Sequence, residues 1–174
     1  MKNITYIFRL TLILLMITSV VAGLLGFVNY LTEDKIAQNT AKKAQQAMQN
    51  VLPAESYEPL EVSKEGIKEA YRCEAGYVVR VAKNGFGGEI DIMVGIDRNG
   101  AVTGIYIVGH SETASLGSNC EREDWRAQFI GATQALAVNK DGGEIDALTG
   151  ATVTSRAVVE GVNLALEFVK EVLG

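Results

Sequence analysis

Cysteine, proline and histidine are scarce in this chain of 174 residues, which contains two cysteines, two prolines and one histidine. The spacing of Cys73 and Cys120 matches no common zinc or iron–sulfur pattern, so we expect no metal site. The two thiols could pair in a disulfide outside the cytoplasm or remain free as small hydrophobic side chains in a core. The sequence leaves both alternatives open.

Acidic residues are missing from the first 31 positions, where Lys2 and Arg9 are the only charged side chains. With those two removed from the 16 basic residues, 14 remain against 21 acidic ones, so the rest of the chain has a net charge of −7. A domain of that charge, without a local cluster of Lys and Arg, repels phosphate backbones. We therefore expect no nucleic-acid binding.

An uncharged apolar run covers residues 10–31. As an α-helix, rising about 1.5 Å per residue, it is long enough to cross the hydrocarbon core of a bilayer. A cleaved signal peptide is the competing interpretation, but its apolar region is usually only about 7–15 residues long. We predict a retained membrane anchor over residues 1–31. Positive charges flank the run on both sides, so they do not determine its orientation.

Residues 32–53 predict a helix that connects this anchor to one folded domain, residues 54–174. The segment is rich in Ala, Gln and Lys, and Pro53 ends it. Its apolar side chains are spaced for one helical face: Ile36, Ala44, Ala47, Met48 and Val51. The helix is either a docking element for a partner or, as we favour, a stalk.

Three β-branched runs, at residues 76–82, 89–96 and 101–108, are separated by strong turn signals and predict antiparallel strands. Their alternation is imperfect, which indicates a sheet covered at least partly on both faces. Residues 54–70 are polar with weak periodicity and predict a loop with a short strand.

Helical patterns follow the strands. Residues 123–130 predict a short helix in which Trp125 and Phe129 share a buried face. Residues 154–173 carry apolar side chains at amphipathic spacing: Val158, Val162, Ala165, Leu166, Val169 and Leu173. The predicted fold class is α+β, with an N-terminal transmembrane helix, a mainly antiparallel sheet and a C-terminal amphipathic helix.

A segment rich in threonine stands directly before that last helix and reads Asp-Ala-Leu-Thr-Gly-Ala-Thr-Val-Thr-Ser over residues 146–155. Glycine permits close backbone approach, the hydroxyls offer donors, and the first amides of a helix favour an anion such as phosphate. The same residues could simply cap the helix, although the Glu or Gln that completes a capping box is missing. From the residues alone, capping is the favoured interpretation.

Two segments match motifs of a known family. Asp146, Thr149, Gly150, Ala151 and Thr152 match Asp-x-x-Thr-Gly-Ala-Thr, and residues 110–117 match His/Asn-x-Glu-Thr-Pro-Gly-Leu-Gly, with Ala114 and Ser115 in place of Pro-Gly. The first motif resembles the flavinylation site of FMN-binding domains in the G subunit of the Rnf-type ion-translocating ferredoxin:NAD⁺ oxidoreductase complex. The C subunit of the sodium-pumping NADH:quinone reductase is related, but its extra length makes the Rnf-type G subunit the closer resemblance.

The resemblance implies that Thr152 Oγ1 carries FMN through a phosphoester and that a flavin transferase attaches it, recognising Asp146. It also implies further cofactor-binding residues: Leu148, Thr149, Gly150, Ala151, Thr154 and Ser155 in the motif, and Glu112, Thr113, Leu116 and Gly117 around the isoalloxazine. No catalytic residue is expected to act on a diffusing substrate. His110 is interpreted as a turn or flavin-adjacent residue rather than a base, since no nucleophile motif accompanies it.

The function implied by the resemblance is electron carriage in a membrane complex that couples electron transfer between ferredoxin and NAD to ion translocation. The expected location is the inner membrane, single-pass, with an extracytoplasmic soluble domain. Residues 10–31 offer no ionisable group as an ion path, so translocation is expected in partner subunits. The alternatives are a membrane-anchored FMN domain that serves as a sensor or local electron donor, and a non-flavin binding domain.

Overall fold

The computed structural model describes residues 2–173, with the backbone alone for residues 2–5, 34 and 37. Met1 and Gly174, the outer ends of the expected anchor and domain, lie outside the described residues. The chain divides into two compact units, Met1–Ala41 and Lys42–Gly174.

Helix α1, Lys2–Val51, joins the predicted anchor and the predicted connecting helix in one element. Its segment Tyr6–Glu33 is long and apolar enough to cross a membrane, with a mean hydropathy of 2.5 and none of it buried. The predicted span, residues 10–31, lies within this segment. The helix ends two residues before Pro53, whose ring and missing N–H do not fit a helix interior.

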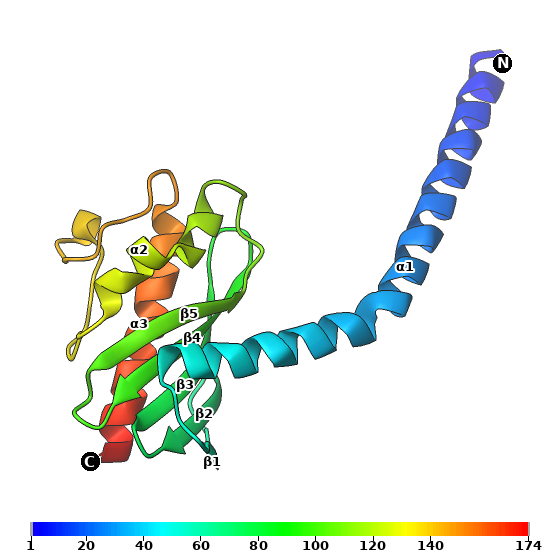
Figure 1. Ribbon diagram of the computed structural model, residues 1–174. Coiled ribbons are helices and arrows are strands. Elements are labelled where there is room, and N and C mark those ends of the chain that lie inside the picture. Colours follow the sequence, from blue (N-terminus) through cyan, green and yellow to red (C-terminus); the bar gives the residue numbers. More distant parts are fainter. Residues whose placement is uncertain (1, 174) are drawn as a thin grey trace. The chain divides into compact units, whose positions relative to one another are not determined.

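The second unit contains one antiparallel sheet of five strands in sequential order. The strands are β1 Glu58–Leu60, β2 Ile67–Cys73, β3 Gly76–Asn84, β4 Glu89–Asp97 and β5 Val102–Gly109 (Figure 1). The three predicted strands are β3, β4 and β5. The prediction of one short strand in residues 54–70 misses most of β2, because only two of its seven residues are buried and its sequence lacks an apolar alternation.

Helix α3, Thr152–Leu173, packs on β3 and β4 and closes the main core on one face of the sheet. Five of the six apolar residues predicted for its inner face are buried, whereas Leu173 is 47% exposed. The helix begins two residues earlier than predicted. Thr152 is therefore its first residue rather than part of the preceding loop.

The opposite face of the sheet is covered by the last turns of α1. Four residues of the predicted helical face are buried there, Ala44, Ala47, Met48 and Val51, together with Leu52. Ile36, which shares their spacing, is 56% exposed. The sheet is thus covered on both faces, as its imperfect alternation indicated.

Short helices cover the β5 edge of the sheet: η1 Gly117–Glu121, α2 Glu123–Arg126 and η2 Ala127–Phe129. The predicted helix at residues 123–130 corresponds to α2 and η2, and the rings of Trp125 and Phe129 meet edge to face at 5.3 Å. Val102 exchanges backbone hydrogen bonds with Gly131 and Ala132, and Arg126 Nη1 donates to Ile105 O at 2.7 Å. These contacts pair backbone groups that an open edge strand would expose.

Both cysteines are free thiols. Cys73 packs with the cluster beneath the end of α1, whereas Cys120 lies in the core on the α3 side of the sheet. The sheet lies between them. The structure therefore contains two free thiols rather than a disulfide. Burial, reinforced by the charges of Glu121 and Glu112, raises the pKa of the Cys120 thiol from 9.0 to about 12.

Candidate functional site

Three segments that are distant in sequence enclose one cavity of about 390 Å³. They are the turn after β3, the loop after β5 and the start of α3. The lining residues are Phe86, Glu112, Thr113, Leu116, Gly117, Gly150, Ala151, Thr152, Val153 and Thr154. Eight of these ten were proposed from the sequence as cofactor contacts, and the volume lies within the usual range of small-molecule sites, roughly 300–1,000 Å³.

Glu112 joins the three segments. Its Oε1 accepts a hydrogen bond from Gly87 N–H at 3.0 Å, and its Oε2 accepts one from Thr154 Oγ1 at 2.6 Å. The side chain is buried, so each bond satisfies a group that would otherwise be costly to desolvate. A Cβ at Gly117 would lie 2.5 Å from Glu112 Oε2, and one at Gly85 would clash with Oε1. Both neighbouring loops therefore need glycine at these points.

His110 orients the loop that carries Glu112. Its Nδ1 accepts a hydrogen bond from Glu112 N–H at 3.1 Å, and its Nε2 lies 3.3 Å from Glu121 Oε1. An Nδ1 that accepts carries no proton, so the neutral ring donates from Nε2. The histidine thus holds the backbone of the loop at Glu112.

The start of α3 presents unpaired backbone donors at the cavity. Among the described residues, the N–H groups of Thr152, Val153 and Thr154 have no protein acceptor. Gly150 enters the helix through a left-handed turn, with φ +76°. Ser155 locks this turn, because its Oγ accepts from Leu148 N–H at 2.9 Å and donates to Ala151 O at 3.0 Å. Free amides at a helix start favour an anion.

Thr152 stands half-buried at the rim of the cavity, and its Oγ1 lies 2.8 Å from Lys140 Nζ. Lys140 belongs to the short helix η3, Asn139–Asp141. Arg156 holds this turn through two 2.7 Å hydrogen bonds to the Asp141 carboxylate. Those bonds lower the pKa of Asp141 and raise that of Arg156.

The remaining predicted residues lie outside the cavity. Ser155 is fully buried beneath it, while Leu148, Thr149 and Asp146 line a separate depression beside Trp125. The backbone of Asp146 is held on both sides, since its carbonyl accepts from Trp125 Nε1 at 2.7 Å and its N–H donates to Gln128 Oε1 at 2.8 Å. Its side chain accepts from Asn139 Nδ2 at 2.9 Å.

Sequence reasoning missed three residues of the site: Phe86, Val153 and Lys140. Phe86 lines the cavity although 74% of it is exposed, and it stands between glycines in a segment that sequence alone marks only as a turn. An aromatic side chain within a glycine-rich turn was the available signal, since turns seldom need one. Val153 and Lys140 carried no signal beyond their closeness to the motif.

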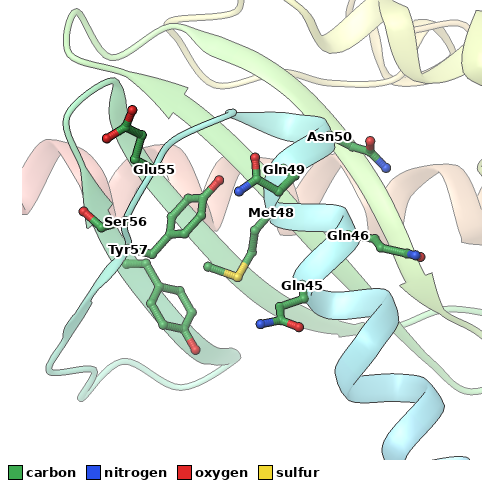
Figure 2. A pocket seen from close by; sticks show the side chains of 9 residues that line it. Gln45, Gln46, Met48, Gln49, Asn50, Glu55, Ser56 and Tyr57 are labelled. Atoms are coloured by element: carbon green, nitrogen blue, oxygen red, sulfur yellow. The ribbon is translucent and has the colours of Figure 1, made fainter.

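A larger cavity, of about 850 Å³, lies between the end of α1 and the β1–β2 side of the sheet (Figure 2). Its polar lining consists mainly of amide and hydroxyl groups: Gln45, Gln46, Gln49, Asn50, Ser56, Tyr57 and Tyr71, with Glu55. The Tyr57 hydroxyl donates to Leu52 O at 2.8 Å and Gln49 Nε2 donates to Ala54 O at 3.0 Å, which ties the helix end to the following loop. The described residues that line it include no cationic side chain and no helix start, so the smaller cavity is the better anion site.

Two family models match parts of the chain. The model of the FMN-binding domain matches residues 85–167, and that of the RnfG N-terminal region matches residues 1–51. The C subunit of the Na⁺-translocating NADH-quinone reductase from Parabacteroides distasonis has the same fold, with a TM-score of 0.56 and 14% identity over 78% of this chain and 92% of that one.

Sequence relatives are similar over most of their length. The G subunit of the ion-translocating oxidoreductase complex of Vibrio vulnificus is 32% identical, over 84% of this chain and 82% of the relative. The G subunit of the Na⁺-translocating ferredoxin:NAD⁺ oxidoreductase complex of Acetobacterium woodii is 34% identical, over 92% and 90%. Its counterpart in the proton-translocating complex of Clostridium ljungdahlii is 33% identical, over 92% and 90%. The chain belongs to the family of G subunits of Rnf-type ion-translocating oxidoreductase complexes.

Proposed function

We propose that this chain is the electron-carrying subunit of a membrane-bound complex that couples ferredoxin–NAD electron transfer to ion translocation, and that its FMN is esterified to Thr152. Family membership and the match to the FMN-binding domain support the flavin and the complex. One relative is named for Na⁺ and another for protons, so similarity selects neither ion. Partner subunits are expected to carry the ion path.

One observation carries the proposal: the Thr152 hydroxyl stands at the mouth of the cavity, at the first residue of α3, beside free backbone amides and Lys140 Nζ. A phosphoester at this oxygen would place its negative charge against those donors. A helix cap would use the hydroxyl to accept from its own first turn, and no such bond is formed among the described residues.

The lining of the cavity suits FMN. Its apolar side chains, Phe86, Leu116 and Val153, can contact a flat aromatic ring, while its polar end at α3 suits a phosphate. The buried carboxylate of Glu112 is already engaged by Gly87 and Thr154, so it serves to hold the walls together. The chemistry that FMN supplies when bound is the uptake and release of electrons, and the protein positions it.

Attachment requires a separate flavin transferase that uses FAD. In that reaction the Thr152 hydroxyl would attack the phosphorus on the FMN side of the FAD pyrophosphate, and an oxygen–phosphorus bond would form as the bond to AMP breaks. AMP leaves with the bonding electrons, and a base of the transferase takes the hydroxyl proton. Asp146, whose backbone is clamped while its side chain is exposed, is a suitable recognition point for that enzyme.

A covalent link also suits a soluble domain outside the cytoplasm. Even a nanomolar site, about −12 kcal/mol, releases its ligand eventually, and no free pool refills it there. The ester removes this loss. We therefore place the domain on the extracytoplasmic side of the inner membrane.

The test is intact-mass spectrometry, with in-gel flavin fluorescence under denaturing conditions, on the full chain co-expressed with a flavin transferase. Wild type should gain the mass of an FMN phosphoester, and Thr152→Ala should gain none, because alanine offers no oxygen to phosphorus. An unmodified wild type, beside another substrate that the same transferase does modify, would refute the proposal.

The chain contains its own matched control, since residues 131–133 are a second Gly-Ala-Thr. Thr133 is exposed in a loop rather than at a helix start, and the amides of Gly131 and Ala132 are bonded to Val102 O and Phe129 O. Thr133→Ala should therefore keep full modification. Loss of FMN from Thr133→Ala, together with its retention in Thr152→Ala, would mean that the exposed tripeptide, rather than the site at α3, is the acceptor.

A further inference from the structure

Lys140 and Thr152 are twelve residues apart and meet through one contact of 2.8 Å between Nζ and Oγ1. An ammonium group has three donors and no acceptor, so Oγ1 accepts in this bond. The proton of the threonine hydroxyl therefore stays free for another acceptor. The contact leaves the hydroxyl ready to lose that proton, and it places a positive charge at the oxygen where a phosphorus would be attached.

The contact is built by the fold around Lys140. Asp141, the next residue, is gripped by Arg156 from the first turns of α3, and Gly142 continues the turn with φ +84°. A Cβ at Gly143 would clash with Ala137 O, so the turn also needs glycine there. These restraints fix the backbone from which Lys140 reaches Thr152.

Charge balance makes a cation at this point useful. Residues 32–174 have a net negative charge, the carboxylate of Glu112 bonds Thr154 in the first turn of α3, and that of Asp146 bonds Asn139, the residue before Lys140. Arg156 is occupied by Asp141. Helix amides contribute only partial charge, equivalent to about half an elementary charge, so they do not neutralise a phosphodiester by themselves.

We propose that Lys140 is the phosphate-pairing residue of this site: it holds the Thr152 hydroxyl before modification and forms the ion pair with the FMN phosphodiester afterwards. The proposal rests on the attachment of FMN at Thr152. Because phosphorus bonds directly to the oxygen that Lys140 contacts, the anionic oxygens come within reach of Nζ without movement of the backbone. Charge-assisted hydrogen bonds of this kind are among the stronger polar contacts in proteins.

The first test measures the initial rate of FMN attachment to the detergent-solubilised full chain by a purified flavin transferase with FAD and Mg²⁺, using intact mass. Lys140→Gln should react about fivefold more slowly, the size expected for a partly exposed charged contact. Lys140→Arg should recover much of the rate. Lys170→Gln is the matched control, since Lys170 is an exposed lysine in the last turn of α3, at the end opposite Thr152, and it should react at the wild-type rate.

The second test asks whether the ion pair exists in the modified protein. The ³¹P resonance of the phosphodiester should differ between modified wild type and modified Lys140→Gln in the folded state, and the two should coincide in urea. In the first test, added salt should narrow the difference in FMN-attachment rate between wild type and Lys140→Gln, because screening weakens the charge contact. A purely structural role for Lys140 would change neither the resonance nor the salt response.

The outcomes separate the two proposals. If wild type gains no FMN mass although the transferase is active, both proposals are refuted: the attachment at Thr152 and the pairing with Lys140. If FMN is attached to wild type and Lys140→Gln at equal rates, Lys140 does not have this role. The same follows if the folded-state ³¹P resonances of the two modified proteins coincide. Either result leaves the flavin function standing.

Discussion

Glu112 is the residue on which the cavity depends most, because one buried carboxylate accepts hydrogen bonds from two other segments of the chain. Gly87 N–H and Thr154 Oγ1 would each lose a partner if it were truncated. Of the two donors Thr154 is the buried one, and a buried donor without an acceptor costs about 1–3 kcal/mol. The carboxylate is therefore expected to hold the site together in the absence of any ligand.

Replacing Glu112 by alanine should lower the free energy of unfolding of the unmodified protein by about 1–3 kcal/mol, since the buried Thr154 hydroxyl loses its acceptor. Urea denaturation measures this change. Glu74→Ala, in the exposed turn between β2 and β3, removes the same charge without these contacts and should have little effect. Equal stability of the two variants would show that Glu112 does not join the segments.

At the scale of elements, the end of α1 is seated on the sheet through two glycines. A Cβ at Gly95 in β4 would lie 2.5 Å from Val51 O, and Gly104, its neighbour in β5, faces the same residue. Thr103 Oγ1 donates to Val51 O at 2.5 Å and fixes the helix end in place. The last turns of α1 are thus part of the domain core, and Gly95 permits the close approach.

Gly95→Ala should push the helix end off the sheet, because a backbone carbonyl cannot move away from the new methyl group as a flexible side chain can. The expected loss is about 1–3 kcal/mol, as for overpacked cores. The hydrogen-exchange rates of the amides of residues 44–52 should increase as the helix end loses its contacts with the sheet. Gly109→Ala is the control, since a Cβ there meets nothing within 4 Å. Unchanged protection in Gly95→Ala would mean that the helix end docks in another way.

For the whole molecule, the two units differ in what they can bury. Residues 42–174 enclose two apolar clusters of their own, one on each face of the sheet. None of the apolar segment Tyr6–Glu33 is buried by the protein. An apolar surface of this extent needs a bilayer or partner helices. Membrane attachment is consequently a property of the first unit alone.

The side of the membrane on which the domain lies can be measured with reporters fused after Gly174. A reporter active only after export should be active, and one active only in the cytoplasm should be silent, because we expect the domain to be extracytoplasmic. The opposite pattern would contradict this topology without affecting the flavin site. Fusion of both reporters to a chain that lacks residues 1–41 supplies the cytoplasmic control.

Much of this protein could be predicted from local patterns. Hydropathy over residues 10–31, β-branched runs bounded by turns, and the 3.6-residue period of the last helix each report a structure made by neighbours in sequence, so the span, β3, β4, β5 and α3 were recognisable. The motif at residues 146–152 is also local, and family membership confirms the resemblance that rested on it. Strand β2 was mostly missed because its sequence carries no such local pattern.

The sequence by itself therefore determined the class of the fold, the membrane-crossing segment and, to within two residues, the start of the helix at Thr152. Only the tertiary structure decided that Glu112 and Thr154, 42 residues apart, share a hydrogen bond, that Lys140 reaches Thr152, and that Cys73 and Cys120 lie on opposite sides of the sheet. Such meetings depend on how the sheet, loops and α3 pack together. That packing sums many weak contacts between distant segments, and no short pattern in the chain records it.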